Sequence, residues 1–177
     1  YVITLVANNR LKERTNWVEH TYKVIFNLES FISKMKDAET GVRGYYITRD
    51  ITFLQPYLNS EKSVDSLYAL LDENTKDSRI QQQRLAELKD TYKARFQLFE
   101  EFLSHTKNGV TDTVFKLKPA QEKAKKAMDK IRSLISFMQM EERRLLANRD
   151  ADLKTTFATI NSITIISLLL TLVLVII

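Results

Sequence analysis

The chain has 177 residues, of which 44% are hydrophobic and 28% charged, and its formal net charge is +5 at pH 7. This balance excludes an intrinsically disordered chain, and the length suits one domain with a single core. Cysteine is absent, which excludes a disulfide framework and a cysteine-ligated metal site. The basic residues are spread among 22 acidic ones, a pattern that favours a solvated helical surface over a nucleic-acid-binding patch.

A short apolar segment opens the chain. It runs from Tyr1 to Ala7 and gives way to polar residues at Asn8. So short a segment cannot cross a bilayer core, which takes about 20 helical residues. We therefore expect residues 1–9 to be the outer end of a first transmembrane helix. A signal-peptide remnant and an amphipathic helix end are the alternatives.

A first long helix is predicted to end near Thr48 to Asp50. Its apolar positions recur at alternating steps of three and four residues, the heptad seam of a helix packed at a shallow angle against others. Ile25 and Ile32 widen this stripe, as expected in a bundle rather than in a two-stranded coiled coil. The apolar seam positions are Trp17, Val24, Leu28, Phe31, Met35, Ala38, Val42 and Tyr45, with Thr21 in the gap between the first two.

A second helical stretch is expected over about Ile51 to Asn74. Pro56 stands in its first turns, where a missing amide is least costly, and therefore predicts a kink or a late start. The candidate core residues of this stretch are Leu54, Tyr57, Leu58, Val64, Leu67, Leu70 and Leu71.

A polar turn over Asp72 to Ser78 leads to a third helix. Asp77 or Ser78 is the predicted cap, and Gln81 completes a capping box with Ser78. The pattern weakens near Asn108 and Gly109. The candidate core residues are Leu85, Leu88, Tyr92, Phe96, Phe99, Phe102 and Leu103.

The fourth helix is expected from about Ala120, after a less regular link that contains Pro119. Glu141 interrupts its apolar pattern, but no helix breaker separates it from the last segment of the chain. That segment, Ile160 to Ile177, carries no charge and is long enough to span a bilayer, so we expect it to be a second, truncated transmembrane helix. The candidate core residues are Ala120, Ala124, Ala127, Ile131, Leu134, Met138 and Leu145.

Four stretches joined by short links predict an all-α fold, an antiparallel up-down-up-down four-helix bundle with long first and fourth helices. An even number of helices brings both ends of the chain to one end of the bundle, as two membrane anchors require. We expect residues 10–159 to form an extracytoplasmic sensor domain, with the fourth helix continuing into the second transmembrane helix.

Asp37 to Tyr57, which reads D-A-E-T-G-V-R-G-Y-Y-I-T-R-D-I-T-F-L-Q-P-Y, closely resembles the signature of the third class of CHASE domains. These are sensory extracellular domains associated with cyclases and histidine kinases. Gln81 to Leu88, Ala127 to Arg132 and Glu141 to Arg149 agree with the same family. The resemblance implies an all-helical periplasmic sensor, flanked by two membrane spans, that feeds a cytoplasmic output such as a histidine kinase.

The chain departs from this family at Arg49, where the family usually has glycine. A glycine there would permit the left-handed conformation that ends a helix without steric cost. Arg49 must either accept that cost or end the helix differently.

The signature supplies a candidate structural or switch motif. Glu39 and Arg43 are four residues apart on one helix face, where they could bind a ligand or pair with each other at the flank of the bundle; we favour the pair. Gly41 and Gly44 weaken the helix, and we expect them to admit a neighbouring backbone or a bulky side chain. The motif consists of Asp37, Glu39, Thr40, Gly41, Arg43, Gly44 and Asp50.

Four aromatic side chains gather at the membrane-distal end of the first hairpin: Tyr45, Tyr46, Phe53 and Tyr57. They can line a pocket for a small ligand or plug the end of the bundle. We favour the plug, and a ligand site inside one subunit is expected here first.

No motif for catalysis or for a cofactor is recognisable. His20 and His105 lie on different helices without carboxylates at ligand spacing, so no metal site is expected. The lysine-rich stretch from Lys116 to Lys130 reads as a solvated face. No nucleophile motif or phosphate-binding loop occurs, so enzymatic activity is not expected of this fragment, and a kinase would lie beyond Ile177.

The predicted function is sensory input to a two-component histidine kinase in the bacterial inner membrane, with the bundle on the periplasmic side. The expected partners are the bilayer, a second copy in a parallel dimer and an unknown stimulus or partner protein, without nucleic acid. Glu141, Leu145 and Arg149 belong to the predicted signal-transmitting helix. A chemoreceptor or diguanylate cyclase input is the first alternative, and a membrane-anchored scaffold that senses nothing is the second.

Overall fold

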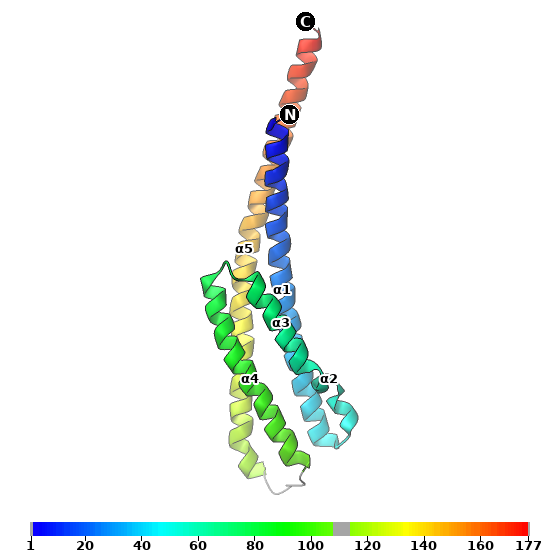
Figure 1. The fold of residues 1–177 in the computed structure, drawn as a ribbon, viewed down its shortest axis with the longest axis vertical. Helices are drawn as coiled ribbons and strands as arrows, with labels where there is room; N and C mark the ends of the chain where they lie inside the picture. The colour runs from blue at the N-terminus through cyan, green and yellow to red at the C-terminus, as the bar shows by residue number, and fades with distance from the viewer. Residues whose placement is uncertain (1, 108–113, 177) are drawn as a thin grey trace. The chain divides into compact units, whose positions relative to one another are not determined.

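The computed structural model describes the backbone of residues 2–107 and 114–176, and the side chains of residues 6–106 and 119–176. The described chain is helical apart from short turns. Its elements are α1 (Val2–Thr48), the 3-10 helix η1 (Ile51–Leu54), α2 (Gln55–Leu58), α3 (Ser60–Asn74), α4 (Arg79–Lys107) and α5 (Val114–Ile176) (Figure 1). The prediction of an all-α bundle with long first and fourth helices is confirmed.

Two compact units share these helices. Residues 24–140 form one, called here the four-helix unit, and residues 1–23 with 141–177 form the other, called here the two-helix unit. The domain boundaries predicted at residues 9 and 159 do not coincide with the limits of these units, and they stay predictions.

The helices of the four-helix unit alternate in direction. Asp65 of α3 accepts a hydrogen bond of 2.8 Å from the Tyr92 hydroxyl of α4, and Gln82 of α4 donates to the backbone oxygen of Asp72, so α3 and α4 are antiparallel. Gln81 donates to the backbone oxygen of Met138, and Glu87 farther along α4 pairs with Lys130, so α4 and α5 are antiparallel as well. This is the expected up-down-up-down order.

The predicted seam of the first helix forms much of the core, since six of its apolar side chains from Val24 to Val42 are at most 2% exposed. The third helix agrees as well, with Leu85, Leu88 and Tyr92 buried. In the fourth helix the phase was partly wrong: Met128 and Ile135 are buried, whereas Ala127 is only half-buried.

The predicted second helix is interrupted in its first turns, as Pro56 led us to expect: η1 and the short helix α2, which has Pro56 at its start, precede α3, which begins at Ser60. Two of its core assignments were wrong. Leu58 and Leu70 were assigned to the core, but they are 61% and 49% exposed. Leu70 lies off the inward face of α3 that carries Val64 and Leu71, and Leu58 is the last residue of α2, which has no buried residue.

The fourth helix also begins earlier than expected. Pro119 was placed in an irregular link, but it lies inside α5, which starts at Val114. As the sixth residue of α5, Pro119 removes one intrahelical hydrogen bond within the first two turns, and the helix continues through it. The predicted end of the third helix near Asn108 lies outside the described residues.

Arg49 adopts the left-handed conformation that the family usually assigns to glycine. Its φ is 62°, and its amide donates a 2.8 Å hydrogen bond to the backbone oxygen of Tyr45, which closes the end of α1. The guanidinium lies 5.3 Å from the centre of the Tyr46 ring. Arg49 therefore accepts the steric cost and partly offsets it through this contact.

Substituting Arg49 by glycine is expected to raise the free energy of unfolding by about 0.5–1 kcal/mol, because relief of the left-handed strain exceeds the lost cation–π contact. Arg49→Ala is the matched control: it keeps the strain and loses the contact, so it should lower stability. Urea unfolding followed by circular dichroism measures both variants, and equal effects of the two would contradict this account.

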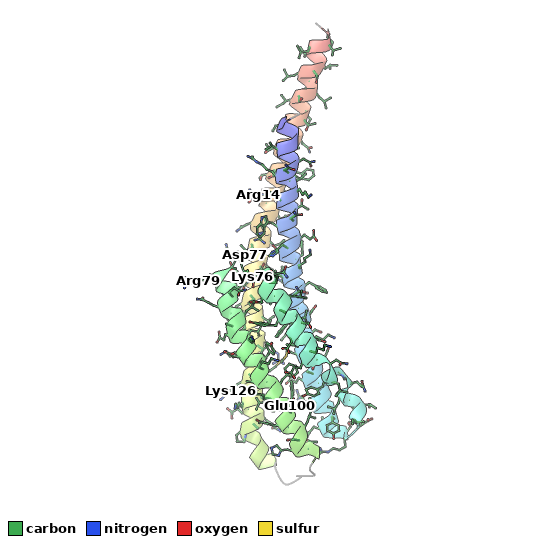
Figure 2. The ribbon with its side chains drawn as sticks, viewed as in Figure 1. Arg14, Lys76, Asp77, Arg79, Glu100 and Lys126 are labelled. Carbon is green, nitrogen blue, oxygen red and sulfur yellow. The ribbon has the colours of Figure 1, made fainter. Side chains whose placement is uncertain are left out.

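In the two-helix unit, the first part of α1 lies antiparallel to the last part of α5. The Arg14 guanidinium, labelled in Figure 2, is 2.7 Å from the Asp152 carboxylate, and Arg149 contacts Trp17 farther along α1.

Within the described chain, α5 is the one helix long and apolar enough by composition to cross a membrane. Its most apolar window has a mean hydropathy of 2.4 and is not buried. The first span predicted over residues 1–9 stays a prediction.

Candidate functional site

The glycines of the signature admit Phe53 against α1. A Cβ atom at Gly41 would lie 2.8 Å from the backbone oxygen of Phe53, and one at Gly44 would meet the Phe53 ring. Both glycines therefore provide the close approach that was expected of them. They hold η1 and α2 against the end of α1.

We expect Gly41→Ala to lower the free energy of unfolding by about 1–2 kcal/mol, because the Phe53 backbone cannot move away without displacing η1. Gly44→Ala should be close to neutral: the Phe53 ring is 44% exposed and can rotate, and alanine gains about 1 kcal/mol of helix propensity. The order of the two unfolding midpoints tests this. The account is wrong if Gly44→Ala is the more damaging change.

Glu39 connects three helices. Its carboxylate is 3.6 Å from Arg95 of α4 and 3.3 Å from Arg132 of α5. Both of these ion pairs go to other helices rather than to Arg43, the partner considered in the sequence analysis. Arg43 is exposed on the same side of α1. The Glu39 side chain is 18% exposed, so it acts as a nearly buried counter-charge.

Arg95 is the most deeply buried charged group near the signature, at 6% exposed. Burial lowers the pKa of its guanidinium, Glu39 opposes that shift, and the positive charges of Arg132 and Arg43 reinforce it. The guanidinium stacks 3.8 Å from the centre of the Phe99 ring. Among the described residues its Nε has no hydrogen-bond partner.

A cavity of about 810 Å³ lies beside this network, lined by residues of α1, α4 and α5. Glu39, Arg43 and Tyr46 come from α1, and Ala120 and Ala124 from the start of α5. The two alanines were assigned to the core by spacing. They are half-buried instead, and their small side chains leave the space open.

The four aromatic residues named as a ligand site do not line one pocket. Tyr46 lines the cavity and packs at 4.9 Å against Phe102. Tyr57 packs at 5.8 Å against Phe99, which also lies on the cavity wall, and Tyr45 packs on the core. Phe53 fills the space beside Gly44. Packing at the end of the bundle accounts for three of the four.

The remaining motif residues lie at the surface of the same hairpin. Asp37 is 3.8 Å from Lys34 on α1, and Thr40 is exposed. The Asp50 carboxylate caps η1 by accepting hydrogen bonds from the side chain and amide of Thr52, which lower the pKa of Asp50. These roles are local to the turn.

In the two-helix unit, Arg149 holds α5 against α1. Its guanidinium lies 4.6 Å from the centre of the Trp17 ring and donates to the hydroxyl of the fully buried Thr21. Glu141 pairs with Arg144 on its own helix at 2.7 Å, and Leu145 is half-buried. Of the residues assigned to the signal-transmitting helix, Arg149 contacts α1 directly.

The two histidines belong to different helices, His20 to α1 and His105 to α4. His20 packs edge-on against Trp17, whereas His105 lines the cavity, and the described residues contain no group of three potential metal ligands. The described part of the lysine-rich stretch pairs at the surface, Lys126 with Glu122 and Lys130 with Glu87. Lys116 lies outside the described side chains.

Sequence reasoning missed Arg95 and Arg132. Arg95 follows Tyr92 by three residues and precedes Phe99 by four, so it occupies a seam position. A charged residue at an apolar seam position was the signal that could have identified Arg95 as a buried charge.

Comparison with known proteins gives one match. A family model described as the CHASE3 domain matches residues 14–152. No curated protein matches the chain, and no solved structure matches it.

Proposed function

The chain belongs to the CHASE3 family of extracellular sensory domains of signalling proteins, and on this premise we propose that it is the input domain of a membrane-bound sensor histidine kinase. The proposed site of action is the bacterial inner membrane, with the four-helix unit on the periplasmic side. CHASE3 domains are sensory and non-catalytic, so phosphotransfer belongs to another part of the receptor.

The observation that carries this proposal is the continuity of α5. One unbroken helix, Val114–Ile176, contains buried core residues such as Ile131 and Met138 as well as the exposed apolar run that can cross a membrane. A shift, tilt or rotation of a helix is transmitted along it, because its hydrogen bonds resist bending. Packed helices offer alternative arrangements within a few kcal/mol, which a stimulus can bias.

We propose further that the receptor acts as a parallel homodimer through parts of α1 and α5. Phe26 on α1 is 66% exposed, and Phe137 and Met140 on α5 are 48% and 60% exposed. Apolar side chains of this size are often covered by a partner. Light scattering of the purified chain in detergent checks the mass, and a monomer at all concentrations contradicts the dimer.

A cross-link in the two-helix unit tests the sensory role. The chain has no cysteine, so Arg14→Cys with Asp152→Cys creates a unique pair, which a short bismaleimide can bridge. A sensor locked in this way should give one constant output, whatever the stimulus. If the locked receptor still responds like the unlocked one, the domain is a scaffold rather than a sensor. Each single-cysteine variant treated with the same reagent is the control.

The kinase output is tested by the coding sequence that follows Ile177. A phosphoacceptor histidine helix and an ATP-binding domain support it. A long heptad hairpin rich in glutamate and glutamine would instead identify the receptor as a chemoreceptor, and a cyclase domain would identify it as a cyclase.

A further inference from the structure

The cavity of the four-helix unit has a buried arginine in its wall whose donors are not all used. Arg95 is 6% exposed, its ion pair with Glu39 spans 3.6 Å, and its Nε has no hydrogen-bond partner among the described residues. A buried guanidinium offers five N–H donors, and leaving them unpaired costs free energy. Arg95 lines the cavity, so an acceptor that entered it would lie beside this guanidinium, although the unpaired Nε itself is buried.

The charges on the cavity wall favour an anion as that acceptor. Arg43, Arg95 and Lys125 contribute positive charge to the wall, against Glu39 and Glu101. The carboxylate of Glu39 is shared, because it also pairs with Arg132 of α5. Arg132 also has Asp129 as a partner, at 2.9 Å, so the positive charge of the wall rests on Arg43, Arg95 and Lys125 against the two carboxylates of Glu39 and Glu101.

The rest of the wall favours an apolar body. Tyr46, Phe99 and Phe102 present aromatic rings, and Ala120 and Ala124 present methyl groups. A volume of about 810 Å³ falls within the range of about 300–1,000 Å³ typical of small-molecule pockets. Arg95 stacked on Phe99 places the donor group beside the apolar surface.

We infer that this cavity binds a small organic anion with an aromatic or other apolar body, whose carboxylate pairs with Arg95. The inference rests on the proposed sensory function, because such a ligand would be the stimulus. Binding would tie α1, α4 and α5 together and bias their packing.

The test uses the purified full chain in detergent and three probes matched in shape: 1-naphthaleneacetate, its neutral amide and 2-(1-naphthyl)ethylamine. Isothermal titration calorimetry should show saturable binding of the acid, about tenfold or more tighter than of the amide, because the carboxylate gains charge-assisted hydrogen bonds. The amine should bind more weakly than the amide.

Four variants locate the site. Arg95→Met should remove the preference for the acid over the amide, while Glu39 retains Arg132 as its partner. Ala124→Leu fills the cavity without changing its charge and should abolish binding of both. Lys125→Met should weaken acid binding, whereas Lys126→Met should not, because Lys126 is absent from the cavity wall and its side chain is 75% exposed (Figure 2). Circular dichroism confirms that each variant is folded.

Equal affinity for acid and amide, no saturable binding of the acid at millimolar concentration, or undiminished binding in folded Ala124→Leu would each overturn the inference. These outcomes are separable from failure of the proposed function. If the cross-link between positions 14 and 152 locks the output but the chain binds no anion, the receptor senses another stimulus. If the chain binds the acid but the cross-link leaves the output of the receptor unchanged, the binding site exists and the sensory role does not.

Discussion

Replacing Glu39 with alanine is expected to lower the free energy of unfolding by about 3 kcal/mol, because it leaves the buried Arg95 without its counter-charge. Arg132 loses the same partner, but it keeps its 2.9 Å ion pair with Asp129 and its side chain is 45% exposed, so water can solvate it. Most of the loss therefore arises at Arg95. Urea unfolding of the purified chain, followed by circular dichroism, measures the difference.

The matched control is Glu122→Ala, which breaks an ion pair with Lys126 at the surface. Both of those side chains are at least 64% exposed, and the cost should stay below about 1 kcal/mol. A double variant, Glu39→Ala with Arg95→Met, should recover much of the stability, because no buried charge is then left unpaired. If Glu39→Ala costs no more than Glu122→Ala, the Glu39 network does not stabilise the bundle.

Inserting a single alanine after Asn148 is expected to abolish or lock the output of the receptor. The insertion rotates the downstream part of α5 by about 100° relative to the upstream part. Arg149 and Asp152 would then lose their register with Thr21 and Arg14 on α1. Phosphotransfer by the proposed kinase, with and without the stimulus, measures the effect in the intact receptor.

An insertion of seven residues at the same position is the matched control. Seven residues complete two helical turns to within about 20°, so the downstream face is nearly restored while the helix becomes longer. This variant should retain much of the response. An unchanged response after the single insertion would contradict transmission by a continuous helix.

The family signature and the core were largely predictable from the sequence, because both depend on local spacing. Steps of three and four residues place Val24, Leu28 and Phe31 on one face of a helix whatever packs against it. The family usually has glycine at the position of Arg49, so the sequence left two options there: a left-handed residue or a different helix end. The structure has the first.

The candidate site was less predictable, because it depends on which helices meet. The sequence predicted a pair between Glu39 and Arg43, four residues apart on one helix. In the structure, the ion pairs of Glu39 are with Arg95 and Arg132 on other helices. The sequence separates Glu39 from these partners by more than fifty residues. Nothing local could rank such pairs above the nearby one.

The amino-acid sequence by itself determined the helices, their heptad seams, the charge-free apolar run at the end of α5 and the family. All of these follow from the type and spacing of residues along one segment. Only the tertiary structure decided that Arg95 is buried, that Ala120 and Ala124 leave a cavity open, and that Leu58 and Leu70 face outward. Burial and cavity volume depend on the distance and rotation between neighbouring helices, which packing of the whole core sets.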